Sequence, residues 1–305
     1  MSDKGRFTFS HEQLDQYFDR IALPQPKRIF NVSSLGADEQ LLYLTALLKH
    51  QLARIPFENL TQHYSGHRVV DVKPLHIFRK VIDHPGWGGY CMEANSLLHH
   101  LLLSLGFDCY IAAGRVWTPA EKWTGWTHLV NLVTIGDTKY LCDSGFGTNE
   151  PIVPIPLQHN AQRVQVWPAE SKLVHESLPQ YLSDCKLWIC QFRARPQAEW
   201  SQAYCFSETE LLPQDVIDMN YSPWLNRAIH FTQQITCVRY TIDGEEEDGP
   251  NGLPTGDLID SGVIHGTLTI SHDKLKWRRV GRDVLDANFE SEEDRINALK
   301  QYWGI

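Results

Sequence analysis

The stretch Trp87-Gly88-Gly89-Tyr90-Cys91-Met92-Glu93-Ala94-Asn95 stands directly before a leucine-rich run that extends to Leu105. Glycine has no Cβ, so the Gly88-Gly89 pair allows the backbone to approach another segment closely. A helix that begins at Cys91 places the thiol at the positive end of the helix dipole, where unpaired amides favour thiolate over thiol. Because the thiolate is the nucleophilic form, Cys91 is the first candidate for a reactive residue.

The length and charge of the chain narrow the class of protein before other motifs are considered. Its 305 residues are enough for a sizeable core and two or three structural units. The net charge is −9 and no long basic run is present, so a nucleic-acid partner is not expected. An acidic total still allows a local basic pocket for a phosphorylated co-substrate.

Targeting, membrane and metal signals are weak. The leucine-rich run over 97–105 contains His99 and His100 and is far shorter than the ~20 apolar residues of a membrane span. No apolar segment typical of a signal peptide follows Met1, and the seven cysteines form no CxxC pair. We therefore expect a cytoplasmic protein with reduced thiols and no membrane association. His99 and His100 lack a partner motif such as HExxH, so no metal is expected.

Helical patterns dominate the first third of the chain and strand patterns follow, which indicates an α+β fold. Helices are expected from a capping box at Ser10, over 37–53, over 75–82, from Cys91 to Gly106 and after a cap at Ser291. Strands are expected over 108–116, 127–135, 138–143, 187–193, 232–242 and 263–271. The acidic segment 243–257, rich in Gly and Pro, is expected to be a solvated loop.

A predicted hairpin brings two polar side chains together. Gly136-Asp137 is a two-residue turn signal with glycine first, so Ile135 is expected to pair with Thr138. In this register His128 and Asp143 project from the same face, because side chains alternate with period two. They are then diagonal neighbours, roughly 7–8 Å apart at Cα and within reach of a hydrogen bond. A shift of one residue would place them on opposite faces.

Cys91, His128 and Asp143 together have the chemistry of acyl transfer. A carboxylate bound to one imidazole nitrogen fixes the tautomer and stabilises the imidazolium, and the other nitrogen can serve a thiol. Taken singly, the residues have plainer interpretations: a packed cysteine, a satisfied strand histidine and a turn aspartate. Their agreement with the Gly-Gly-Tyr-Cys context and the hairpin geometry favours a Cys–His–Asp site.

These residues and their surroundings resemble the arylamine N-acetyltransferase family. Arg54–Leu60 is similar to its [IV]-P-F-E-N-L segment, and Gly88–Asn95 to its nucleophile motif R-G-G-[WY]-C-x-E-x-N. Thr124–Val133 resembles the strand that carries the family's histidine, and Asp143–Pro154 resembles its D-x-G-F-G-x-x-x-P-x-x-P segment. The resemblance covers about residues 40–157, is weaker in the last hundred residues, and extends to fungal-type members of the family.

The resemblance implies a multidomain fold with a papain-like Cys-His-Asp core. Its parts are an N-terminal helical bundle over 1–90, the nucleophile helix with a central β-barrel over 91–200, and a C-terminal α/β lid over 201–305. It also implies a transferase of xenobiotic metabolism. Acetyl-CoA or another acyl-CoA acylates Cys91, and the thioester passes to an aromatic amine or hydrazine in ping-pong order. His128 is then the base that activates Cys91, and Asp143 orients His128.

Substrate contacts are carried over by the same resemblance. Thr124 and Gly125 match positions near coenzyme A. Phe57, Trp117 and Phe146 match positions that line the acceptor pocket. Without the resemblance, core packing explains these aromatic residues equally well.

One position departs from the family motif. The chain has Trp87 where the family has an arginine that pairs with the glutamate of P-F-E-N-L, here Glu58. Loss of one partner of a buried ion pair costs several kcal/mol unless the other charge is paired again or protonated. Arg54, Arg68 or Arg79 could replace the arginine, or Glu58 could bond to amides around a repacked Trp87. We expect Trp87 to support its loop without entering the chemistry.

Three classes of function follow from the sequence. An N-acyltransferase is the leading hypothesis, with acetyl as the expected acyl group and malonyl or propionyl as alternatives. A malonyl carboxylate requires a nearby cation, which the sequence does not place. A hydrolase with the same Cys-His-Asp triad is the second class. An inactive relative that binds coenzyme A is the third, and the Trp87 departure keeps it open.

Overall fold

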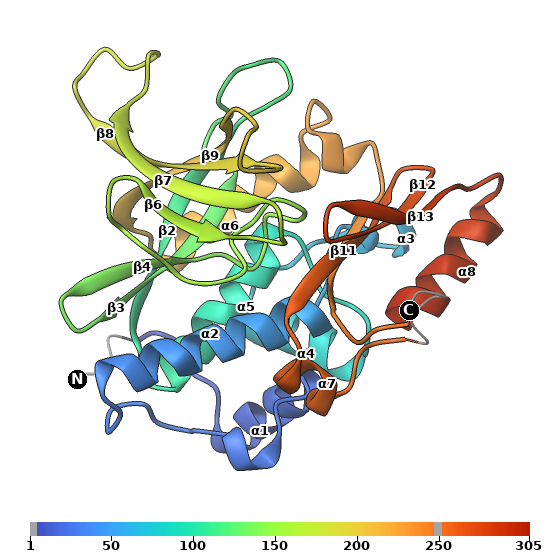
Figure 1. The fold of residues 1–305 in the computed structure, drawn as a ribbon, viewed down its shortest axis with the longest axis horizontal. Helices are drawn as coiled ribbons and strands as arrows, with labels where there is room; N and C mark the ends of the chain where they lie inside the picture. The colour runs from blue at the N-terminus through green and yellow to red at the C-terminus, as the bar shows by residue number, and fades with distance from the viewer. Residues whose placement is uncertain (1–4, 247–251) are drawn as a thin grey trace.

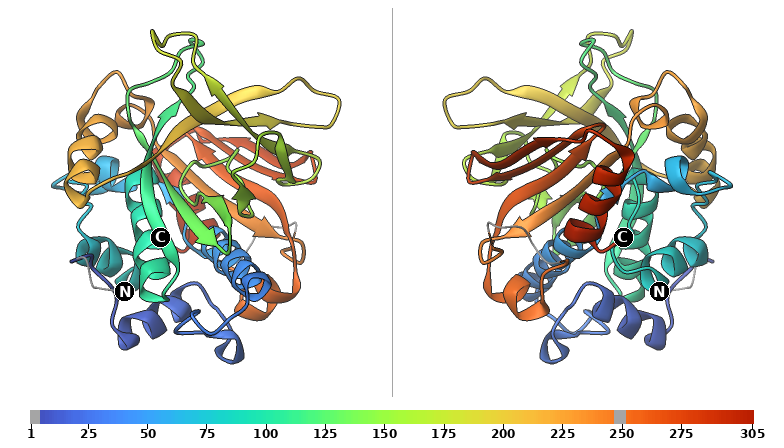
Figure 2. Two further views of the ribbon diagram at one scale, coloured as in Figure 1. Left: turned by 90° about the vertical axis from the view of Figure 1, so that its left-hand side faces the viewer. Right: turned by 90° about the vertical axis from the view of Figure 1, so that its right-hand side faces the viewer.

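The computed structural model describes residues 5–246 and 252–305 (Figure 1). Helices make up most of the chain before residue 105. They are α1 (His11–Arg20), a short 3₁₀ turn (Gln25–Lys27), α2 (Ala37–Arg54), α3 (Leu60–Tyr64), α4 (Pro74–Asp83) and α5 (Cys91–Ser104). Figure 2 shows most of these helices gathered below two sheets.

Local sequence signals explain where these helices begin. Ser10 and Gln13 form the predicted capping box of α1 through reciprocal bonds of 3.2 and 2.9 Å. The predicted start of α5 at Cys91 is confirmed, and the helix ends within two residues of the expected Gly106. Four leucines of α5 are buried, namely Leu97, Leu98, Leu101 and Leu102, and α5 packs against β2 and β3 of the larger sheet. The nucleophile candidate therefore stands at the end of a helix that the core holds in place.

The larger sheet is a nearly closed barrel. Its strand order is β5-β4-β3-β2-β9-β8-β7-β6, all antiparallel, and the edge strands β5 and β6 lie near each other. The strands are β2 (Asp108–Val116), β3 (His128–Ile135), β4 (Thr138–Cys142), β5 (Ile155–Pro156), β6 (Ala161–Val164), β7 (Glu170–Ser177), β8 (Lys186–Arg193) and β9 (Ser201–Glu210). The predicted strands over 108–116, 127–135, 138–143 and 187–193 are confirmed within one residue at each end.

A second sheet, in the order β1-β10-β11-β12-β13, contains the remaining strands. They are β1 (Phe57–Glu58), β10 (Thr236–Ile242), β11 (Ile264–Ser271), β12 (Lys274–Arg279) and β13 (Arg282–Asn288). The helices of this part are α6 (Pro213–Leu225), a 3₁₀ turn (His230–Thr232), α7 (Gly256–Ser261) and α8 (Glu292–Trp303), which Ser291 caps as predicted. The multidomain α+β fold with a barrel is thus confirmed, whereas the domain limits at 90 and 200 stay predictions.

Two expectations for the C-terminal part are wrong in detail. The strand expected over 232–242 begins at Thr236, because a 3₁₀ turn precedes it. The segment 243–257 is not uniformly solvated: Glu245 is buried and forms an ion pair of 2.9 Å with buried Arg239. Part of this segment lies outside the described residues, and α7 begins at its end.

Candidate active site

The loop before α5 places Cys91 by close backbone contacts. A Cβ on Gly88 would lie 1.9 Å from the carbonyl oxygen of Pro56, and one on Gly89 would lie 2.5 Å from the Cβ of Glu93. The predicted close approach at the glycine pair is therefore confirmed. Cys91 is only 3% exposed, and its Sγ donates to the carbonyl oxygen of Thr127 at 3.4 Å.

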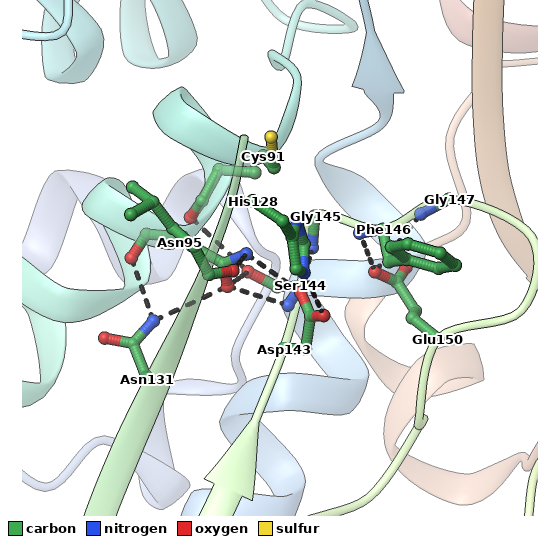
Figure 3. Close-up of polar contacts among 12 residues, drawn as sticks. Cys91, Asn95, His128, Asn131, Asp143, Ser144, Gly145, Phe146, Gly147 and Glu150 are labelled. Carbon is green, nitrogen blue, oxygen red and sulfur yellow. Dashed lines mark hydrogen bonds and ion pairs between the residues drawn. The ribbon is translucent and has the colours of Figure 1, made fainter. Parts of the chain in front are cut away.

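The predicted hairpin brings His128 to Asp143. Ile135 pairs with Thr138 across the turn, and the ladder continues to Asn131 opposite Cys142. Asp143 follows directly, and its Oδ2 lies 2.7 Å from Nε2 of His128. Both side chains are buried, so the pair is shielded from water. Figure 3 shows Cys91, His128 and Asp143 one below the other.

Hydrogen bonds on the far side of Asp143 fix its carboxylate. Asn95 Nδ2 donates to Oδ1 at 2.8 Å, and the Gly145 amide donates to the same oxygen at 3.0 Å. Burial opposes the charged form, but His128 and these donors outweigh it and lower the pKa of Asp143. Asn95 lies one helical turn after Cys91, so a single helix positions both the thiol and the support of the carboxylate.

The surroundings of His128 favour its charged form. Burial opposes a buried imidazolium, but the Asp143 carboxylate, its hydrogen bond and the Cys91 thiol outweigh burial and raise the pKa of His128 to about 10. Because Nε2 faces Asp143, Nδ1 is the nitrogen that can serve Cys91. The arrangement can therefore hold a thiolate beside an imidazolium, which is the ion pair used in acyl transfer.

Two of the three aromatic residues expected in the acceptor pocket lie near this centre. The ring of Phe146 is 5.3 Å from His128, and Phe57 packs 5.6 Å from Phe231 and against Gly147. Trp117 instead packs edge-to-face on Trp123 at 4.8 Å, at the end of β2. Their roles toward an acceptor stay predictions.

Thr124 and Gly125 lie in the loop that leads into His128. Thr124 Oγ1 accepts from the Val116 amide at 2.9 Å and contacts Thr127 Oγ1 at 2.8 Å. Thr127 in turn accepts from Cys91, so this loop reaches the nucleophile through one residue. Gly125 is exposed, with open space where a Cβ would stand.

The structure adds residues that the sequence interpretation did not assign. Buried Glu150 accepts from the amides of Phe146 at 2.6 Å and Gly147 at 3.4 Å, and burial raises its pKa well above the usual range. Tyr204, on the unpredicted strand β9, packs 4.8 Å from His128. The spacing of Asn95 from Cys91 could have revealed the role of Asn95, but no local pattern marks Glu150 or Tyr204.

The prediction that Arg54, Arg68 or Arg79 pairs with Glu58 is wrong. Lys80 pairs with Glu58 at 2.8 Å, and amides supply further bonds, in agreement with the alternative of amide bonding. Arg54 instead donates to backbone carbonyl groups of Arg20 and Pro254. The cation that balances Glu58 is therefore Lys80 on α4, and not one of the arginines.

Neither a metal site nor a membrane helix was found in the described chain. Over residues 5–246 and 252–305, no three His, Cys, Asp or Glu side chains are grouped so as to hold a metal ion. Across the same ranges, no helix combines the length and apolar character that crossing a membrane requires.

Comparisons with known proteins agree with this geometry. The model of the N-acetyltransferase family matches residues 40–246. The N-malonyltransferase FDB2 of Gibberella moniliformis is 29% identical, covering 99% of this chain and 91% of that protein. Arylamine N-acetyltransferase 1 of Homo sapiens is 31% identical, covering 96% of this chain and 93% of that protein.

Solved structures share the fold. The arylamine N-acetyltransferase of Salmonella typhimurium has a TM-score of 0.75 at 23% identity, with 98% of this chain and 92% of that chain covered. The enzyme of Mycobacterium marinum, solved in complex with CoA, has a TM-score of 0.73 at 22% identity, with 96% and 92% covered. At these identities the two structures show the fold alone.

Proposed function

This chain belongs to the arylamine N-acetyltransferase family of acyltransferases, and we propose that it moves an acyl group from acyl-CoA to an aromatic amine or hydrazine through Cys91. One observation carries the proposal: a buried His128–Asp143 pair of 2.7 Å stands beside a cysteine at a helix start. Such a pair stabilises an imidazolium, and an imidazolium stabilises a thiolate.

The first half-reaction acylates Cys91. The thiol proton moves to Nδ1 of His128, and the thiolate attacks the carbonyl carbon of the acyl-CoA thioester. A bond forms between that carbon and Sγ, while the bond between the carbon and the coenzyme A sulfur breaks. The departing thiolate takes the proton from His128, so free coenzyme A leaves and the histidine is neutral again.

The second half-reaction transfers the acyl group to the amine. The amine nitrogen attacks the Cys91 thioester, a C–N bond forms and the bond from carbon to Sγ breaks. His128 accepts the proton that the nitrogen loses, which regenerates the imidazolium and thiolate. Asp143 keeps the ring in one orientation during both halves, because its Oδ2 holds Nε2 and its Oδ1 is fixed by Asn95.

The acyl group is the finer part of the proposal. Acetyl was the expectation from the sequence, and the similarity to the FDB2 N-malonyltransferase supports malonyl as the competing donor. Arg115 is a candidate cation for a malonyl carboxylate or a coenzyme A phosphate. Its Nη1 donates to the carbonyl oxygen of Thr124 at 3.0 Å, and its guanidinium carbon Cζ lies 3.9 Å from the centre of the Trp126 ring. Its buried Nε has no hydrogen-bond partner among the described residues.

A donor panel tests the function. The protein is mixed with acetyl-, propionyl- or malonyl-CoA and analysed by intact-protein mass spectrometry, then a simple arylamine is added. An adduct on Cys91 that the amine removes supports the proposal, and Cys91→Ser should abolish adduct and turnover. Turnover by Cys91→Ser would refute the mechanism. Hydrolysis of amides without an adduct would favour the hydrolase, and coenzyme A binding without an adduct would favour an inactive relative.

A further inference from the structure

A buried charge cluster lies behind the nucleophile loop. It consists of Glu58 on β1, Lys80 on α4 and Glu93 in the first turn of α5. The Lys80 ammonium is 2.8 Å from Glu58 Oε1 and 2.9 Å from Glu93 Oε1. The side chains are 0%, 9% and 2% exposed, so one cation joins three segments away from water.

Backbone amides of the nucleophile loop complete the cluster. Glu58 accepts from the amides of Leu60 at 2.5 Å and Gly88 at 3.3 Å, and Glu93 accepts from the Tyr90 amide at 3.3 Å. Gly88 and Tyr90 lie three and one residues before Cys91. The position of the loop therefore depends on carboxylates that Lys80 holds.

Trp87 closes the cluster from outside. Its ring centre is 5.7 Å from the Lys80 ammonium, close enough for a cation–π contact. It also packs against the buried cluster that contains Leu299 and Trp303 of α8. A Cβ on the adjacent Gly86 would lie 2.3 Å from the Trp303 carbonyl oxygen, so the loop is also held from the C-terminal side.

The cluster contains one more carboxylate than cations. Burial opposes the Lys80 charge, but Glu58 and Glu93 outweigh burial and raise its pKa, so Lys80 stays protonated. Burial, together with Glu58, raises the pKa of Glu93 to about 7 against the effect of Lys80. Two carboxylates then compete for one ammonium at and above neutral pH.

From this geometry we propose that Lys80 is a positioning residue for Cys91. By binding Glu93 and Glu58, it fixes the first turn of α5 and the Gly88–Tyr90 backbone in the orientation that presents the thiol to His128. Lys80 does not contact the thiol, so it acts only through these partners. The inference rests on the proposed role of Cys91 and explains why position 87 need not carry a cation.

Three variants separate positioning from general stability. Lys80→Met removes the cation, Lys80→Arg restores one, and Glu93→Gln removes the surplus negative charge. Arg79→Met is the matched control, because Arg79 is the exposed preceding residue of α4. Each purified variant is checked for folding by circular dichroism. Single-turnover acylation of Cys91 by acetyl-CoA and malonyl-CoA is followed from pH 6 to 9, with coenzyme A affinity measured separately.

Other ionisable groups near the cluster must be considered in the pH profiles. The Tyr90 phenol lies near Glu93, the Cys237 thiol on β10 lies near Glu58, and the His84 ring is 6.4 Å from the Trp87 ring. None of these is altered by the three variants. A step near pH 7 that disappears in Glu93→Gln is therefore assigned to the cluster.

The expected result is acylation at least tenfold slower in Lys80→Met, with coenzyme A affinity within threefold of wild type. Lys80→Arg should recover to within threefold, Arg79→Met should match wild type within twofold, and Glu93→Gln should lose the step near pH 7. A folded Lys80→Met that acylates within threefold of wild type overturns the proposal. The proposal is also overturned if Lys80→Arg acylates no faster than Lys80→Met, or if the step near pH 7 is unchanged in Glu93→Gln.

Two further readouts keep the test decisive. If Lys80→Met does not fold, the rate of Lys80→Arg and the pH profile of Glu93→Gln decide. Alkylation of Cys91 by iodoacetamide, which requires no coenzyme A, is measured in parallel. If wild type forms no acyl adduct, the proposed function fails, whereas the Lys80 proposal is still judged by the alkylation rates.

Discussion

Asp143→Asn tests the charge of His128 directly. The substitution keeps the shape of the side chain but removes the negative charge 2.7 Å from Nε2. In wild type, burial opposes the imidazolium, and the Asp143 carboxylate is the largest effect that raises the pKa of His128 from 6.5 to about 10. At ~1.4 kcal/mol per pH unit, this shift corresponds to about 5 kcal/mol in favour of the imidazolium. Without the carboxylate, burial leaves a neutral imidazole at pH 7.

The assay is the rate of Cys91 alkylation by iodoacetamide, with peptide mass mapping to distinguish Cys91 from exposed Cys185. The alkylation rate of wild type at pH 6.5 should lie within a few-fold of its rate at pH 8.5. An ordinary thiol titrates near 8.5, so Asp143→Asn should react about 100-fold more slowly at pH 6.5 than wild type. Asp137→Asn, in the exposed hairpin turn, should behave as wild type. The same pH profile in Asp143→Asn as in wild type would refute the reasoning.

Gly145→Ala should slow acylation at least 100-fold and lower Tm by several degrees, because the new Cβ would lie 2.9 Å from Cys91 Cα. Gly125→Ala, at an exposed position with open space around it, is the control for melting. Equal Tm values for the two variants would contradict the packing argument. Arg115→Met should reduce kcat/KM for malonyl-CoA at least tenfold more than for acetyl-CoA if its guanidinium binds the acyl carboxylate, whereas equal losses would assign it to a phosphate. Because burial raises the pKa of Glu93 to about 7, the stability contributed by its protonation is full below about pH 4.5 and is lost as pH rises through about 7. The difference in unfolding free energy between wild type and Glu93→Gln should therefore change by up to about 1.4 kcal/mol per pH unit across that window in urea titrations, and a constant difference would be the contrary result.

The parts of the site that could be predicted depend on short-range rules. The register of the β3–β4 hairpin follows from a two-residue turn, so the contact between His128 and Asp143 could be expected from the sequence. The start of α5 follows from the glycine pair and the leucine pattern. Both signals lie within twenty residues of the side chains they position, and tertiary contacts did not override them.

Long-range contacts explain what the sequence did not reveal. Glu58 meets Lys80 because β1 and α4 are brought together by the tertiary fold, and no spacing rule favours Lys80 over the three arginines proposed. Strand β12 was missed because charged residues, such as Lys276, alternate with its buried ones and weaken the apolar pattern. Strand β13 was missed because none of its residues is buried and charged residues, such as Asp286, interrupt its short apolar stretch. Strand β9 was missed although its centre is buried, since polar residues occupy both of its ends.

The pairing of Phe57 with Val238 has a consequence for how the enzyme is made. The two residues are 181 positions apart, and Phe57 also bridges to Gly89 in the nucleophile loop. Contacts of such long range form late and slow the folding of a chain. During synthesis, the loop that carries the thiol therefore lacks its final support until residues near 240 have left the ribosome. The orientation of that loop is therefore completed only after the C-terminal sheet has assembled, although Cys91, His128 and Asp143 have all been synthesised long before.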